Sequence, residues 1–135
     1  MRTAFIGLGV MGYPMAGYLA SNGHDVVVYN RTSAKAERWC EQHGGQLADS
    51  PAAAADGADL VFSCVGNDDD VREVMLGKEG ILEGVPAGSI VVDHTTASAS
   101  IAREVAKLMR TKPRPGSPKA APLLRATRAR SRKKR

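Results

Sequence analysis

The chain has 135 residues, of which 43% are hydrophobic, 24% are charged and 4% are aromatic. This length supports one domain rather than two, and the composition is ordinary for a soluble globular protein with an aliphatic core. The apolar runs are far shorter than the ~18 residues of a membrane span and no signal peptide is recognisable, so we expect a cytoplasmic protein. Cys40 and Cys64 lack the spacing of a metal or redox motif, and we expect no metal site.

The chain has a net charge of +5, and its excess of basic residues lies entirely at the C-terminal end. Residues 1–109 contain 8 Lys/Arg and 14 Asp/Glu, whereas residues 110–135 contain 11 Lys/Arg and no acidic residue. The basic segment also contains Pro113, Pro115 and Pro118, which are incompatible with a helix interior. We therefore predict a folded domain over residues 1–109 and a disordered basic tail over residues 110–135.

Short apolar segments alternate with segments of helical periodicity as far as residue 109. We predict strands at residues 3–6, 25–29, 46–48, 60–64 and 89–93. We predict helices from Met11 to the Asn22-Gly23 stop and at residues 33–43, 50–56, 68–76 and 98–109. Ser33, Ser98 and either Asp68 or Asp69 are the expected helix caps. The alternation indicates an α/β fold: a doubly wound parallel sheet in the order 3-2-1-4-5, with helices on both faces.

A glycine-rich turn directly follows the first strand and opens the first helix. Gly7-Leu8-Gly9-Val10-Met11-Gly12 reads G-x-G-x-x-G. In this pattern Gly7 permits the tight turn, Gly9 leaves room for a pyrophosphate, and Gly12 lets helix and strand pack closely. Free N–H groups at the helix start then face the anion. A glycine turn without a ligand is the alternative, but the strand–turn–helix–strand setting favours a dinucleotide-binding, Rossmann-like sheet.

The end of the second strand selects between NAD and NADP. An Asp or Glu at this place would accept the ribose 2′-OH of NAD, but this chain has Asn30-Arg31-Thr32. No carboxylate there repels a 2′-phosphate, and Arg31 offers a planar fork of donors that matches one. We therefore predict NADP as the cofactor, with NAD the weaker ligand; the alternative for Arg31 is a solvated surface arginine.

These motifs resemble those of the β-hydroxyacid dehydrogenase family, which includes 3-hydroxyisobutyrate dehydrogenase, 6-phosphogluconate dehydrogenase and the glyoxylate and succinic semialdehyde reductases. Val65-Gly66-Asn67-Asp68 and Asp93-His94-Thr95-Thr96 are similar to family segments in the same order. The resemblance implies an oxidoreductase in which Val65, Gly66 and Thr96 contact the cofactor. Physical reasoning agrees on the location, since ligands of parallel sheets bind beyond the carboxyl ends of the strands. The predicted cofactor-binding residues are Gly7, Leu8, Gly9, Val10, Met11, Gly12, Asn30, Arg31, Thr32, Val65, Gly66 and Thr96.

Two of these segments also have a purely structural interpretation. The acidic residues 68–70 could be only a helix cap with solvated charges, and Thr95 and Thr96 could be only turn residues at a strand end. A lone histidine such as His94 is more often structural than catalytic.

The resemblance covers residues 1–109 and then stops. Family members continue into a P-x-S-G-G-like segment and a helical domain whose G-x-x-x-x-N-x-x-K motif supplies a lysine as general acid and base, and this chain has neither motif. Carbonyl reduction needs a proton donor held by packed structure. We therefore expect an NADP-binding domain of an oxidoreductase that acts on the CH–OH group of a small β-hydroxy acid or reduces a small aldehyde. We expect it to be truncated before the catalytic domain, with no catalytic residue and little or no turnover.

The gene end is a further question, because an alternative reading frame over residues 121–131 permits a segment close to the missing family motif. An out-of-frame tail is therefore one explanation of the break, and a truncated gene product is the other.

The alternative hypothesis is a non-enzymatic nucleotide-binding protein whose tail binds nucleic acid or directs the protein to the nucleus. Residues 130–135, Arg-Ser-Arg-Lys-Lys-Arg, are similar to such signals. A third hypothesis is a fragment without a stable fold, because the last predicted strand leaves an exposed sheet edge. None of these hypotheses involves a membrane partner.

Overall fold

The structure, a computed structural model, describes residues 1–113 of the chain. Strands and helices alternate along this part, as the sequence predicts. The strands are β1 (Arg2–Ile6), β2 (Asp25–Tyr29), β3 (Gln46–Leu47), β4 (Leu60–Ser63) and β5 (Ile90–Asp93). The helices are α1 (Gly12–Ser21), α2 (Ser33–His43), α3 (Pro51–Ala55), α4 (Asp68–Leu76), α5 (Ile81–Gly84) and α6 (Ala99–Thr111).

The five strands form one parallel sheet in the order β3-β2-β1-β4-β5, which confirms the predicted topology. The central strand β1 pairs with both β2 and β4, so that Phe5 lies opposite Val28 on one side and Phe62 on the other. The chain builds the sheet outward from β1 through β2 to β3, then returns to add β4 on the other side of β1. Strand order therefore reverses between β1 and β4, and the carboxyl ends of both strands meet at this reversal.

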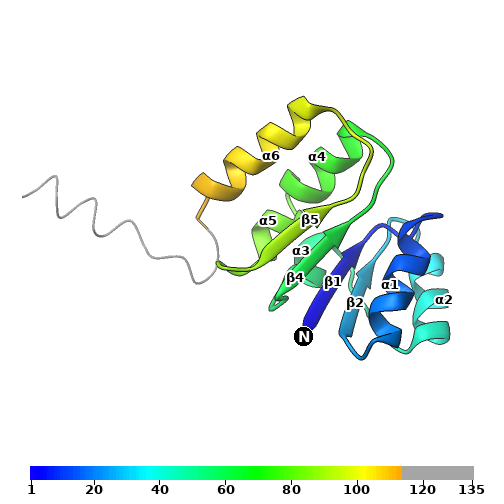
Figure 1. The fold of residues 1–135 in the computed structure, drawn as a ribbon. Coiled ribbons are helices and arrows are strands. Elements are labelled where there is room, and N and C mark those ends of the chain that lie inside the picture. Colours follow the sequence, from blue (N-terminus) through cyan, green and yellow to red (C-terminus); the bar gives the residue numbers. More distant parts are fainter. Residues whose placement is uncertain (114–135) are drawn as a thin grey trace, which may run out of the picture.

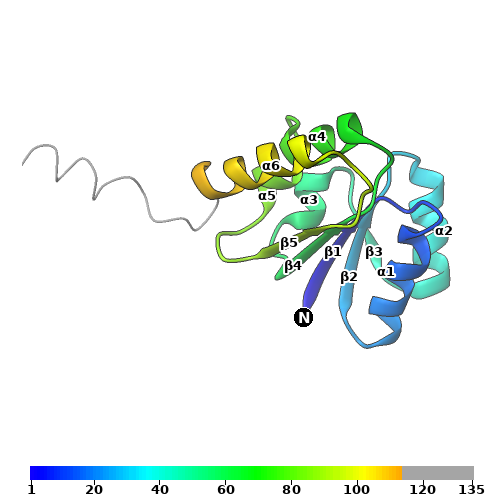
Figure 2. The same cartoon turned by 45° about the horizontal axis from the view of Figure 1, so that its top comes forward.

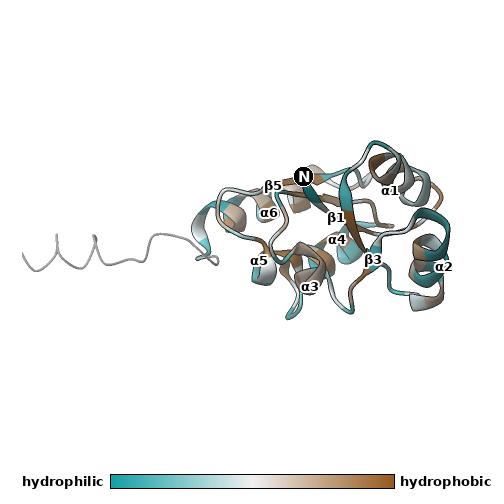
Figure 3. Cartoon of the chain, turned by 90° about the horizontal axis from the view of Figure 1, so that it is seen from below, coloured by the Kyte–Doolittle hydropathy of each residue, from teal (hydrophilic) through white to brown (hydrophobic). Residues whose placement is uncertain are grey.

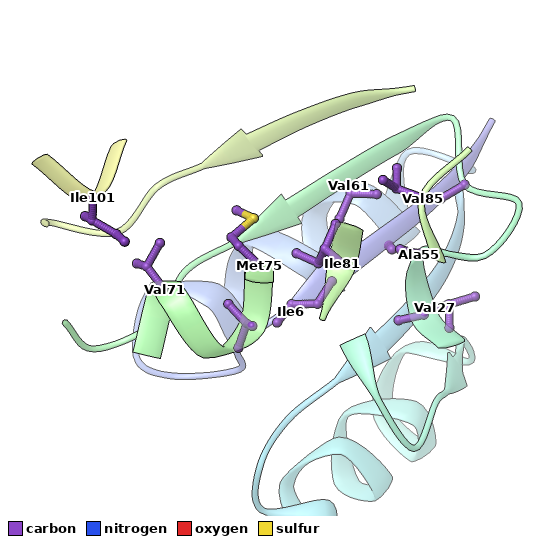
Figure 4. Close-up of a cluster of buried hydrophobic side chains, with 13 residues drawn as sticks. Ile6, Val27, Ala55, Val61, Val71, Met75, Ile81, Val85 and Ile101 are labelled. Atoms are coloured by element: carbon purple, nitrogen blue, oxygen red, sulfur yellow. The ribbon is translucent and has the colours of Figure 1, made fainter. Parts of the chain in front are cut away.

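Helices cover both faces of the sheet (Figures 1 and 2), with α1 and α2 on one face and α3, α4, α5 and α6 on the other. Because neighbouring residues of a strand point to opposite faces, β1 supplies both layers: Phe5 packs with α1 and α2, and Ala4 and Ile6 pack with the helices of the other face. Figure 4 shows side chains such as Val61 and Met75 gathered in this second layer. The core is mainly aliphatic, as the composition predicts.

The layer beneath α1 and α2 is anchored by the one tryptophan. Trp39 of α2 is completely buried, and its Nε1–H donates to the backbone oxygen of Tyr13 in α1 at 3.2 Å. Outside this contact α2 is mainly hydrophilic, as its colouring in Figure 3 shows. The helix is therefore amphipathic, and its apolar side alone holds it against the sheet.

Three local predictions need correction. The cap of α4 is Asn67, whose side chain accepts from the Asp70 N–H at 2.9 Å, and neither Asp68 nor Asp69 has this role. Helix α2 begins after Thr32 without a side-chain cap, and Ser33 is already its first residue. The short helix α5 was not predicted, because four residues are too few for a periodic pattern.

Helix α6 extends two residues beyond the predicted domain boundary at residue 109, since Arg110 and Thr111 are helical. The helix ends where Lys112 adopts an extended conformation, as expected for a residue that precedes a proline. The predicted disordered tail therefore began too early at residue 110. Its remaining part, residues 114–135, lies outside the described residues.

Candidate functional site

A cleft of about 900 Å³ opens at the carboxyl end of the sheet, at the reversal of strand order. Its walls come from the glycine turn after β1, the end of β2, the start of α3, the turn after β4 and one side of α4. The lining residues are Ile6, Gly7, Gly9, Val10, Met11, Gly12, Tyr29, Asn30, Arg31, Thr32, Asp49, Ser50, Pro51, Cys64, Val65, Gly66, Asp70, Glu73, Val74, Gly77, Lys78 and Glu79. The structure thus gathers most of the predicted cofactor-binding residues around one cavity.

The three glycines of the turn are required for different reasons. Gly7 has a φ of +97°, and a Cβ at this position would lie 2.2 Å from the Cys64 carbonyl oxygen. A Cβ on Gly12 would lie 2.0 Å from the Gly7 carbonyl oxygen. A Cβ on Gly9 would meet no protein atom within 4 Å. Packing therefore requires Gly7 and Gly12, whereas Gly9 leaves open space at the cleft wall, which fits a phosphate group in contact with the backbone.

The start of α1 presents backbone donors to this space. The N-cap residue Met11 makes no side-chain capping hydrogen bond. The N–H groups of Gly9, Val10 and Met11 have no acceptor among residues 1–113. The aligned peptide dipoles of α1 add partial positive charge at the same place, and no acidic residue in the first turn offsets it. This end of the cleft is therefore suited to an anion, and the turn fits the diphosphate of a dinucleotide.

Leu8 differs from the other residues of the turn. Its side chain is completely buried with Phe5 and Val28, so it does not line the cleft. Its N–H donates to Asn30 Oδ1 at 2.9 Å, and Asn30 Nδ2 donates to the Thr32 carbonyl oxygen at 3.1 Å. Asn30 therefore ties the glycine turn to the end of β2, and Leu8 supports the cleft from beneath rather than from its wall.

Arg31 lies at the mouth of the cleft in an ion pair. Its Nη2 donates to Asp70 Oδ1 at 2.7 Å, while 73% of the Arg31 side chain is exposed. The hydrogen bond and charge of Asp70 raise the pKa of the guanidinium, which is positive at any working pH. The two residues are 39 positions apart, so the sequence showed a helix-start acid at residue 70 but not its partner. Asp70 is one of several cleft residues that sequence analysis missed, with Asp49, Glu73, Lys78 and Glu79.

The turn after β4 is held by a chain of hydrogen bonds from β5. The Val65 N–H donates to Thr95 Oγ1 at 3.0 Å, and Thr95 Oγ1 donates to Asp93 Oδ1 at 2.7 Å. The buried Ser63 hydroxyl donates to the same carboxylate oxygen at 2.8 Å. Asp93 and Thr95 therefore position Val65 and Gly66 at the cleft wall. Thr96 is exposed and does not line the cleft.

A cysteine side chain also lines the cleft. Cys64 lies at its wall with a free thiol whose pKa is raised by burial and by the charge of Asp93. Within residues 1–113 no three His, Cys, Asp or Glu side chains are grouped to hold a metal ion.

In the same part of the chain, no helix is both long and apolar enough to cross a membrane. The basic run at residues 130–135, on which the nucleic-acid hypothesis depends, lies outside the described residues.

Comparison with known proteins agrees with the geometry of the cleft. An uncharacterized oxidoreductase of Shewanella frigidimarina is 66% identical over 105 residues, which are 78% of this chain and 36% of the relative. The chain thus spans about a third of the length of the curated relatives it matches.

Solved structures share the fold. Mycobacterium tuberculosis 3-hydroxyisobutyrate dehydrogenase, solved with L-serine, has a TM-score of 0.74 and 29% identity over 85% of this chain and 38% of that one. An imine reductase from Myxococcus stipitatus in complex with NADP+ has a TM-score of 0.72 and 27% identity over 82% of this chain and 37% of that one. These likenesses confirm the predicted Rossmann-like sheet.

The family described as the NAD binding domain of 6-phosphogluconate dehydrogenase matches residues 2–114. That span contains the whole sheet, the glycine turn and every residue that lines the cleft. It bears out the nicotinamide dinucleotide predicted from the turn, and the resemblance to 3-hydroxyisobutyrate dehydrogenases is confirmed as well. The chain therefore belongs to the family of NAD binding domains of 6-phosphogluconate dehydrogenase.

Proposed function

We propose that the chain is an NADP-binding domain of an oxidoreductase that acts on the CH–OH group of a small β-hydroxy acid or reduces a small aldehyde. The observation that carries the binding role is the open space at Gly9 beside the free N–H groups of the glycine turn. The substrate class rests on the likeness to 3-hydroxyisobutyrate dehydrogenase, and the choice of NADP on Arg31.

Three walls of the cleft have binding roles in this proposal: the glycine turn, the end of β2 and the turn after β4. The N–H groups of Gly9, Val10 and Met11 bind the diphosphate, and the guanidinium of Arg31 binds the ribose 2′-phosphate through paired charge-assisted hydrogen bonds. Val65 and Gly66, held by Thr95, orient the nicotinamide half of the cofactor. When bound, the cofactor would accept a hydride from the CH–OH carbon of a hydroxy acid or donate one to the carbonyl carbon of an aldehyde.

The preference for NADP has indirect support as well. The Myxococcus stipitatus imine reductase, which shares this fold, was solved with NADP+ bound. At the end of β2 the chain has no acidic residue, since the lining there is Asn30, Arg31 and Thr32. Thr96 stays a proposed contact of the cofactor, as the family resemblance implies, although it lies off the cleft wall.

The test is a titration of the full 135-residue chain with NADPH and NADH, followed by calorimetry or nicotinamide fluorescence. We expect NADPH to bind more tightly. Arg31→Ala should weaken NADPH binding by about 10-fold or more, because hydrogen bonds to charged groups contribute about 1.5–3 kcal/mol. NADH affinity should change little.

Arg38→Ala is the matched control, since Arg38 is an exposed arginine of α2 that does not line the cleft. It should leave both affinities unchanged. Equal affinities of the wild-type chain for NADPH and NADH, or an equal loss of both in Arg31→Ala, would contradict the assignment of NADP.

A further inference from the structure

The ion pair between Arg31 and Asp70 joins two walls of the cleft. Arg31 follows β2, and Asp70 lies in the first turn of α4. The distance from Arg31 Nη2 to Asp70 Oδ1 is 2.7 Å. Asp70 is the more enclosed partner, with 25% of its side chain exposed against 73% for Arg31. The group that we expect to bind the 2′-phosphate is therefore already engaged with an anion of the protein.

The residues around Asp70 place its carboxylate next to Arg31. Its backbone N–H donates to Asn67 Oδ1 at 2.9 Å, which fixes the first turn of α4. A Cβ on Gly66 would lie 2.7 Å from Asp70 Oδ2, so the carboxylate lies directly over this glycine. A side chain on residue 66 would require this carboxylate to shift. One oxygen then faces Gly66, while the other accepts from Arg31.

Other acidic residues that line the cleft add negative charge to that of Asp70. Carboxylates of Asp49, Asp70, Glu73 and Glu79 line the cleft, against the cations Arg31 and Lys78. The charges of Asp70 and then Glu73 both raise the pKa of Arg31. A phosphate that approaches Arg31 must therefore displace Asp70 or share the guanidinium with it, and like charges so close together repel each other. A ribose with a free 2′-OH brings no such charge.

We propose that Asp70 is a specificity-determining residue, which competes with the 2′-phosphate of NADP for Arg31 and so narrows the preference of this site for NADP over NAD. The proposal rests on the proposed function, because it needs the dinucleotide in this cleft with its 2′-phosphate at Arg31. Asp70 thereby lowers the preference for NADP that Arg31, at the end of β2, provides.

The experiment is to titrate Asp70→Asn with NADPH and NADH under the conditions used for the wild-type chain. The amide keeps the shape of the side chain but removes its charge. We expect NADPH to bind about 3- to 10-fold more tightly, in the range that single partly exposed ion pairs contribute. The affinity for NADH should stay within about twofold, because no phosphate charge is involved.

Asp69→Asn is the matched control. Asp69 lies next to Asp70 in the same helix turn, is 94% exposed and pairs with Arg72 at 3.3 Å rather than with Arg31. The substitution makes the same change in net charge and in the charge at the start of α4. We expect it to leave the affinities for both nucleotides unchanged. A change of affinity that appears in both Asp69→Asn and Asp70→Asn would be an effect of net charge or of the helix dipole.

The double variant Arg31→Ala/Asp70→Asn tests whether Asp70 acts through Arg31. With Arg31 absent, the removal of the Asp70 charge should no longer strengthen NADPH binding. The proposal is overturned if Asp70→Asn leaves NADPH binding unchanged or weakens it. It is also overturned if the variant strengthens NADH binding equally, or if the gain persists in the double variant.

These failures differ from a failure of the proposed function. If the wild-type chain binds NADPH in preference to NADH and Arg31→Ala removes this preference, the function stands whatever Asp70→Asn shows. If the wild-type chain binds neither nucleotide, or binds both equally with no effect of Arg31→Ala, the function fails and the role of Asp70 falls with it.

Discussion

The three glycines of the turn have different roles, two in folding and one in binding. Gly7 and Gly12 are placed where a side chain would overlap a carbonyl oxygen, so the backbone could not keep this path with alanine there. Gly9 has no such neighbour within the protein. The G-x-G-x-x-G pattern is thus two structural requirements and one binding requirement, and substitution can separate them.

Gly12→Ala should mainly reduce stability, whereas Gly9→Ala should mainly reduce binding. Gly12→Ala should lower the free energy of unfolding by about 1–3 kcal/mol or more, through steric overlap with the Gly7 carbonyl. Gly9→Ala should leave stability within about 0.5 kcal/mol and reduce NADPH affinity by at least tenfold, since its methyl group enters the space of the diphosphate.

Urea unfolding curves and NADPH titrations of both variants measure the two effects. Gly12→Ala serves as the stability reference for Gly9→Ala. A Gly9→Ala protein that binds NADPH like the wild type would show that the open space at Gly9 is not the diphosphate site.

At the scale of elements, α6 is joined to α4 through its capping residue. Ser98 caps α6 by accepting from the Ile101 N–H at 3.2 Å. Its own N–H and hydroxyl donate to the two carboxylate oxygens of Asp68 in α4. Arg72 and Glu104 add an ion pair of 3.1 Å between the same helices. Only Ile101 of α6 is fully buried, so these polar contacts form much of its attachment.

The contact between Asp68 and Ser98 should make stability depend on pH. Hydrogen bonds from the Ser98 hydroxyl and N–H lower the pKa of Asp68 from its ordinary value of 3.8. A lowered pKa in the folded state adds stability above the unfolded-state pKa, and this is lost as the pH falls through the folded-state pKa. The wild type should therefore exceed Asp68→Asn in stability at pH 7, and the difference should shrink as the pH falls below 3.8 and disappear below the folded-state pKa of Asp68.

Chemical unfolding of both proteins between pH 7 and pH 2 measures this difference. Ser98→Ala should be less stable than the wild type at pH 7 by about 1 kcal/mol from the lost helix cap alone. A difference between wild type and Asp68→Asn that is constant across this pH range would show that the carboxylate charge plays no part.

At the scale of the whole molecule, the cleft depends on both halves of the sheet. The end of β2 contributes Arg31, and the turn after β4 contributes Val65 and Gly66. Between them lies β1, whose residues Ala4, Phe5 and Ile6 are completely buried. A ligand that contacts both halves therefore stabilises the native packing of the domain as a unit, since the unfolded chain has no such cavity.

Saturation with NADPH should raise the melting temperature of the chain. At 100 times Kd a ligand that binds only the native state adds about 2.7 kcal/mol, which corresponds to about 10 °C for a domain of this size. Thermal unfolding with increasing NADPH gives the shift. At the same NADPH concentration Gly9→Ala should show about half of it or less, because tenfold weaker binding reduces the added stability to about 1.4 kcal/mol. No shift in the wild type at saturating NADPH would contradict binding to the folded state.

Much of this architecture follows from the sequence alone. The apolar runs, the helical periodicity and the short links between them leave few arrangements other than a parallel sheet, because crossovers between parallel strands are right-handed. The glycine turn could be predicted because G-x-G-x-x-G directly follows a strand and opens a helix, although the Cys64 carbonyl that excludes a side chain at Gly7 lies far along the chain. Arg31 could be placed at the cleft because the end of a strand in this fold always lies there.

Tertiary structure decided which side chains meet. The sequence showed four polar residues at positions 67–70, each able to cap a helix. In the structure Asn67 is the cap of α4, and Asp70 meets Arg31, which is 39 positions away. Leu8 lies within the glycine motif, yet the sheet buries it and Asn30 takes its N–H. Local patterns determine strands, helices and turns because their forces act between near neighbours. Contacts between residues far apart in the chain depend on how whole elements pack, which no local pattern encodes.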